Sequence, residues 1–167
     1  QQGGHAYAMA TLEALGSDER YLHRGLPYGV AFTGLWSLFV PLIAPGVVDA
    51  LEPEMERLKA LCFRLDVATV HAYAPMGPRS FYARDFAPLL GIPEDPVTGS
   101  ANAALGALLA RAGVVPRREG KVLLTVYQGH HLGNPGVVEV QVEYSPTGEP
   151  YSVQIGGEAV IVQTGEV

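Results

Sequence analysis

The sequence predicts an α+β domain in which a largely antiparallel sheet wraps around one buried helix. Three observations support this prediction. The chain has 167 residues, 48% of them hydrophobic and 17% charged, enough for one domain with a substantial core. Its 13 prolines and 20 glycines divide it into short segments, as expected for strands joined by turns. One segment, residues 101–112, is apolar on every side at helical spacing, which is typical of a helix enclosed by other elements.

The first half of the chain is expected to mix helices with strands. Gly16 ends the first apolar helical pattern, and Pro53 stands where the first turn of a later helix tolerates proline. Pro41 ends a β-rich stretch that is either a strand pair or one long strand. The expected elements are helices over residues 6–15 and 54–62, and strands over residues 30–42, 66–73 and 80–86.

The second half is expected to contain four strands after the buried helix. Apolar and polar residues alternate most regularly in "GVVEVQVEY", which places the valines on the core side. The many alanines of the helix, together with Gly106, fit close packing against surrounding strands. The four expected strands cover residues 121–129, 136–144, 151–157 and 158–167. The whole chain then has about seven strands and three helices.

Composition excludes several classes of function. The net charge of −6 argues against nucleic acid as a partner, because phosphate binding needs a basic surface. Cys62 is the single cysteine, which rules out an intrachain disulfide and a cysteine-built zinc site and favours a reducing, cytoplasmic location. No apolar run reaches the roughly 20 residues of a membrane span, so no membrane partner is expected. The chain starts at Gln1 without Met, and residues upstream are expected to be missing.

The stretch "EDPVTGSAN", residues 94–102, precedes the buried helix and has two interpretations. The backbone N–H groups at a helix start need acceptors, and Thr98 or Ser100 is able to supply one as a cap. Alternatively, this end opens into a cleft, where the N–H groups and the helix dipole bind a carboxylate or phosphate. Gly99 then lets a ligand approach the backbone, and Asp95 is the nearest group able to accept or orient a proton.

A longer stretch resembles a known family. "RDFAPLLGIPEDPVTGSANAAL", residues 84–105, is similar to the signature of the PhzF-like (phenazine biosynthesis) proteins, roughly R-x-F-x-P, a short Gly-containing spacer and E-D-P-[AV]-T-G-S-A. "YQGHHLG", residues 127–133, resembles the later Q-G-x-x-x-G stretch of the family, and Gly156-Gly157 before a strand resembles its C-terminal end. The resemblance therefore covers most of the chain.

This resemblance implies a diaminopimelate-epimerase-like fold, in which two similar halves each wrap a barrel-like antiparallel sheet around a central helix. The active site lies between the halves, and the starts of both central helices hold the substrate carboxylate. It implies cofactor-free isomerisation by general acid–base proton transfer on a small carboxylate-bearing substrate. Carried over by position, Asp95 is the supporting catalytic acid or proton relay, and the substrate-binding residues are Thr98, Gly99, Ser100 and Ala101.

The resemblance also has limits. The acid/base Glu and a partner His of the family lie in its N-terminal half, whereas residues 1–167 correspond to a single domain, the C-terminal half. Asn134 stands where the family usually has Arg. The expected partners are that N-terminal half and a second copy in a homodimer. The alternative hypothesis is a non-catalytic anion-binding or interaction domain that lacks the acid/base Glu.

Other candidate residues support no site. His130 and His131 are adjacent, point to opposite sides of an extended segment and have no third ligand at a recognisable spacing, so no metal is expected. His71 is isolated in the sequence and is expected to be packed or solvated. Cys62 lies among apolar helical neighbours and is expected to fill the core.

Overall fold

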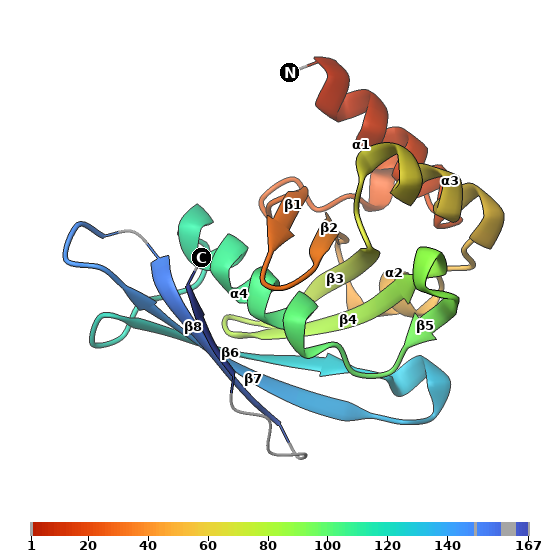
Figure 1. The fold of residues 1–167 in the computed structure, drawn as a ribbon. Helices are drawn as coiled ribbons and strands as arrows, with labels where there is room; N and C mark the ends of the chain where they lie inside the picture. The colour runs from red at the N-terminus through yellow and green to blue at the C-terminus, as the bar shows by residue number, and fades with distance from the viewer. Residues whose placement is uncertain (1, 149, 158–162, 167) are drawn as a thin grey trace.

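A computed structural model describes residues 2–148, 150–157 and 163–166, and it contains one curled sheet with helix α4 lying inside the curl (Figure 1). The helices are α1 (Gln2–Ala14), α2 (Pro45–Asp49), α3 (Met55–Leu65) and α4 (Gly99–Ala112), with short 3₁₀ turns at Glu19–Tyr21, Pro88–Leu90 and His130–Leu132. The strands are β1 (Gly29–Phe32), β2 (Trp36–Pro41), β3 (Thr69–Gly77), β4 (Ser80–Ala87), β5 (Ile92–Asp95), β6 (Lys121–Gln128), β7 (Gly136–Tyr144), β8 (Pro150–Gly157) and β9 (Gln163–Glu166).

The sheet runs in the order β1-β2-β3-β4-β6-β7-β8-β9, and β5 pairs with β4 beside the main path. Neighbouring strands are antiparallel except for β2 with β3 and β4 with β6. The prediction of an α+β domain with a largely antiparallel sheet is therefore confirmed. The two parallel contacts arise where helical segments cross over between the strands, α2 and α3 in the first case and α4 in the second.

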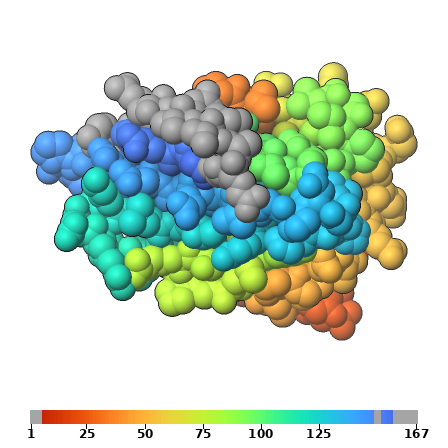
Figure 2. All heavy atoms as spheres, turned by 90° about the horizontal axis from the view of Figure 1, so that it is seen from below, coloured from red at the N-terminus to blue at the C-terminus, as the bar shows by residue number. Residues whose placement is uncertain are grey.

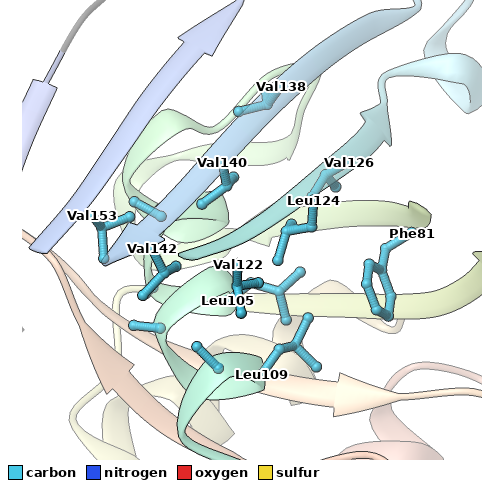
Figure 3. Close-up of a cluster of buried hydrophobic side chains, with 14 of the residues drawn as sticks. Phe81, Leu105, Leu109, Val122, Leu124, Val126, Val138, Val140, Val142 and Val153 are labelled. Atoms are coloured by element: carbon cyan, nitrogen blue, oxygen red, sulfur yellow. The ribbon is translucent and has the colours of Figure 1, made fainter. Parts of the chain in front are cut away.

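Helix α4 is enclosed by the sheet, as its apolar pattern predicts. It contacts β1 and β2 on one side and β6, β7 and β8 on the other. In Figure 3, Val138, Val140 and Val142 of β7 lie on the side of the sheet that faces α4, where Leu105 and Leu109 point towards the strands. All five side chains are buried. Seen from below in Figure 2, cyan and blue residues from the β6–β7 region cross the middle of this face, with yellow-green and orange residues from the first half of the sequence beneath them.

Gly106 allows the closest approach between α4 and the sheet. A Cβ atom built on this residue would lie 2.5 Å from Cγ1 of Val140, closer than real Cβ contacts. The helix axis can therefore approach β7 only because residue 106 has no side chain. The sequence-based link between Gly106 and close packing is confirmed.

A second core lies on the other side of β2, β3 and β4. Helices α1, α2 and α3 cover it, and Leu58, Leu61 and Cys62 of α3 are buried there. Cys62 is thus the core residue that its apolar neighbours indicate. Among the described residues, no helix has both the length and the apolar character needed to cross a membrane.

Most expected elements are present, with shifted ends. Helix α1 begins at Gln2 instead of residue 6, and α2 was not expected because its five residues are too few for a helical pattern. Strand β3 begins at Thr69 because Asp66 adopts a left-handed conformation and ends α3. Residues 30–42 form the hairpin of β1 and β2. The last expected strand is described only for residues 163–166, and its residues 158–162 lie outside the described part.

Candidate functional site at the start of helix α4

Backbone N–H groups at the start of α4 have no hydrogen-bond partner among the described residues. Thr98 occupies the N-cap position, but its side chain makes no bond to the helix N–H groups. Instead, Thr98 Oγ1 donates to Asp95 Oδ2 at 3.0 Å. Among the described residues, no acceptor faces the N–H groups of Gly99, Ser100 and Ala101. A helix start with free donors carries a partial positive charge, so this end suits an anion.

The five residues expected at the site differ in how far they are exposed. Gly99 and Ser100 are half-buried, whereas Ala101 and Thr98 are 1% and 7% exposed. Asp95 is half-buried at the end of β5, and its Oδ1 accepts from the N–H of Val97 at 3.3 Å. The Asp95 carboxylate is thus held by two donors from its own loop. These two hydrogen bonds orient the carboxylate within the loop that leads into α4.

Glu94, the neighbouring acid, has a different role. Its carboxylate accepts from Arg84 Nη2 at 2.7 Å, and both side chains are buried, at 9% and 3% exposure. Arg84 Nη1 also donates to the backbone carbonyls of Val48, Asp49 and Leu51. This ion pair therefore ties β4 and β5 to the turn after α2. Adjacent residues of a strand face opposite sides, which separates the structural Glu94 from the site residue Asp95.

A chain of buried polar side chains leads from Asp95 into the sheet. Gln128 Nε2 donates to Thr98 Oγ1 at 3.0 Å and to the backbone carbonyl of Asp95 at 2.8 Å. Asn102 Nδ2 donates to Gln128 Oε1 at 2.8 Å, and Asn102 Oδ1 lies 2.8 Å from His71 Nε2. Asn102, Gln128 and His71 are fully buried. These contacts fasten the first turn of α4 to β3 and β6.

The series of hydrogen-bonded polar side chains ends at a buried pair of residues on neighbouring strands. His71 Nδ1 lies 2.7 Å from Asp85 Oδ2, and the two residues are directly opposite each other in the β3–β4 register. Burial raises the pKa of Asp85, and the contact with His71 partly opposes that rise. Asp85 Oδ1 is buried with no hydrogen-bond partner among the described residues. His71 is packed, as expected, but it is connected to the site and not isolated.

Asn102, Asp85 and His71 were not predicted from the sequence to lie near the site. Asn102 carried a usable signal, because it is an amide within an otherwise apolar stretch of helix, where a buried polar group needs partners. His71 and Asp85 carried none, since only the strand register brings them together. Gln128 was quoted as part of the Q-G stretch without a role.

Two backbone segments close around the helix start. Thr33, in the β1–β2 turn, donates through Oγ1 to the carbonyl of Ser100. On the other side, Gly129 has a φ of 88°, and a Cβ atom on it would lie 2.7 Å from the Pro96 carbonyl oxygen. The Q-G stretch thus needs glycine because it packs directly against the loop of the site.

No group of three or more His, Cys, Asp and Glu side chains suited to a metal ion occurs in the part of the chain that the structure describes. His131 lies 3.5 Å from Asp49 through Nδ1, and His130 packs against the rings of Tyr82 and Tyr127. His130 therefore packs against residues of β4 and β6, and His131 lies beside the end of α2.

Comparison with known proteins agrees with this geometry. The family model described as phenazine biosynthesis-like protein matches residues 3–165. A relative from Deinococcus radiodurans, named an uncharacterized isomerase, is 50% identical over 97% of this chain and 52% of its own length. The chain thus spans about half the length of the curated relatives it matches.

Solved structures give the same result for the fold. A PhzF-family phenazine biosynthesis protein from Bacillus anthracis superposes with a TM-score of 0.77 at 26% identity, over 96% of this chain and 55% of that one. A probable proline racemase from Agrobacterium radiobacter K84 shares the fold at 13% identity, with a TM-score of 0.54 over 77% of this chain and 40% of that one. The curled half-barrel and the signature at the start of its central helix agree with these matches, and the chain belongs to the PhzC-PhzF family of phenazine biosynthesis-like proteins.

Proposed function

We propose that the protein is an isomerase that moves a proton between carbon atoms of a small carboxylate-bearing substrate. The observation that carries this proposal is the pairing of free backbone donors at Gly99 and Ser100 with the oriented carboxylate of Asp95. Membership of a family whose matched relatives are named isomerases supports it.

The two parts of the site have separate tasks in this proposal. The Gly99 and Ser100 N–H groups bind the substrate carboxylate, aided by the dipole of the 14-residue helix α4. Binding there fixes the substrate and withdraws charge from the carbon next to the carboxylate. Asp95 then acts as the supporting acid or as a proton relay at that carbon. Neither task requires a metal or an organic cofactor.

A second half of the same protein is proposed to complete the site. The matched relatives are about twice as long as this chain, and the family resemblance assigns the acid/base Glu to their other half. In this proposal, the exposed side of the α4 start faces that half, and the substrate lies between the two.

Proton transfer to carbon is measurable without knowing the physiological substrate. The intact protein is incubated in D₂O with a set of small aliphatic and aromatic carboxylates, and loss of C–H signals is followed by ¹H NMR. We expect deuterium incorporation into at least one compound, and Asp95→Asn should slow it by about 10²-fold or more. Asp66→Asn, an equivalent change at an exposed residue after α3, should leave the rate unchanged.

The opposite results are equally informative. Binding of these carboxylates at residues 95–101 without any exchange would favour the anion-binding alternative. If the protein shows no binding and no exchange at millimolar ligand, both functions are contradicted.

A further inference from the structure

The buried polar chain behind Asp95 has a direction that backbone groups determine. Gln128 Nε2 faces the carbonyl of Asp95, which only accepts, and Gln128 Oε1 faces the N–H of Thr98 at 3.4 Å, which only donates. Because neither backbone group can change its role, the Gln128 amide has only one orientation that satisfies both. The Gln128 oxygen therefore faces the side chain of Asn102, and its NH₂ group faces the hydroxyl of Thr98.

This orientation propagates inwards to His71. Asn102 must direct its NH₂ group at Gln128 Oε1, so its Oδ1 faces His71 Nε2 at 2.8 Å. A carbonyl oxygen only accepts, so His71 Nε2 must carry a proton. His71 Nδ1 and Asp85 Oδ2 then share a single proton across their 2.7 Å contact.

The orientation of the Gln128 amide also determines the hydrogen bonds on the side of the site. Gln128 Nε2 donates to Thr98 Oγ1, so the Thr98 hydroxyl directs its own proton elsewhere, and Asp95 Oδ2 lies 3.0 Å away. Every bond from His71 to Asp95 thus donates in one direction. A chain of aligned bonds strengthens its members, and this one ends on a carboxylate.

We propose that His71, Asn102 and Gln128 are positioning residues, which act through the Thr98 hydroxyl to hold Asp95 in one orientation beside the free N–H groups of α4. The His71–Asp85 pair is the inner end of this series, and Asn102 Oδ1 is the group that requires the proton on His71 Nε2. The expected effect on turnover rests on the proposed isomerase function. The order of the hydrogen bonds is independent of that function.

The inner end is tested first, in the unmodified protein. With ¹⁵N-labelled histidine and ¹³C-labelled asparagine, we expect a slowly exchanging proton on His71 Nε2 and a correlation through the hydrogen bond to the side-chain carbonyl of Asn102. An unprotonated Nε2, with the Asn102 NH₂ group facing it, would overturn the proposal.

The outer end is tested with two variants and a matched control. Gln128→Glu keeps an acceptor for Asn102 and replaces the NH₂ group, which donates two hydrogen bonds at the outer end, with a carboxyl oxygen that donates at most one; Thr98→Val removes only the hydroxyl link. The control is Gln154→Glu, the same chemical change at an exposed position of β8. We expect the ¹³Cγ resonance of Asp95 to move in both chain variants and to stay in the control. An unchanged Asp95 resonance in folded Gln128→Glu and Thr98→Val proteins would refute the positioning role. Thermal unfolding identifies any variant that does not fold.

Turnover supplies an independent readout. In the deuterium-exchange assay, Gln128→Glu should lower kcat about tenfold with KM unchanged within about twofold, because the change alters Asp95 and leaves the carboxylate donors in place. A rise in KM with unchanged kcat would contradict the role. If the unmodified protein exchanges no carboxylate, the proposed function fails, while the two resonance measurements still decide whether the chain positions Asp95.

Discussion

Loss of charge should have different effects at the two adjacent acids of the E-D-P motif. It should lower stability at Glu94 and lower the deuterium-exchange rate at Asp95. Glu94→Gln leaves the Arg84 guanidinium, which is 3% exposed, without the carboxylate that pairs with it among the described residues. Breaking a buried ion pair costs about 3–5 kcal/mol, and the three carbonyls that still accept from Arg84 favour the lower end, about 3 kcal/mol. For a chain of this size that loss corresponds to a fall in Tm of about 6–12 °C.

Asp95→Asn should change stability by no more than about 1 kcal/mol. The residue is half-buried, and the asparagine Oδ1 still accepts one of the two hydrogen bonds from Thr98 and Val97. Its effect should instead appear in the deuterium-exchange rate.

Urea or thermal denaturation of both variants, together with the exchange assay, separates the two roles. An Asp95→Asn variant that loses as much stability as Glu94→Gln would refute the assignment of Asp95 to the site. A Glu94→Gln variant with unchanged stability would refute the structural role of the ion pair.

Other predictions concern packing and ionisation. Gly106→Ala should lower the free energy of unfolding by roughly 1–2 kcal/mol in a denaturation experiment, because the added methyl group collides with β7. Gly46→Ala adds its methyl group in open space on α2 and should raise the free energy of unfolding by about 0.5–1 kcal/mol. Burial raises the pKa of Cys62 to about 11, so its thiol should react with a disulfide reagent near pH 8 only after unfolding; fast reaction of the folded protein would contradict its burial. The Tyr82 hydroxyl lowers the pKa of Asp49. That stabilisation is present above the unfolded pKa of 3.8 and is lost as pH falls through the lowered value. The stability difference between the native protein and Tyr82→Phe should therefore stay constant at neutral pH and shrink as pH falls below 3.8.

The architecture was largely predictable because it depends on local patterns. The uniformly apolar helix α4 required a surrounding sheet, and the alternating valines of β7 identified the face that packs on it. The parallel pairing of β2 with β3 was not predictable, since nothing local distinguishes it from the antiparallel pairs around it.

The site was predictable only where it is contiguous in sequence. The loop from Asp95 to Ala101 could be recognised as one segment, but His71 and Asp85 join it through strand register and through Asn102, which is 31 residues beyond His71. Glu94 received no role from the sequence, and its buried ion pair with Arg84 became visible only in the structure. A long-range contact between polar side chains leaves no periodic signal in one sequence.

The contact between Gly106 and Val140 has a consequence for how this sequence can change over time. The two positions occupy one shared volume, so a methyl group added to the helix has to be removed from the strand. Gly106→Ala combined with Val140→Ala should therefore cost less than the sum of the two single changes. Among relatives, we expect residues larger than glycine at the first position to occur together with residues smaller than valine at the second, so that the two sites exchange size as a pair.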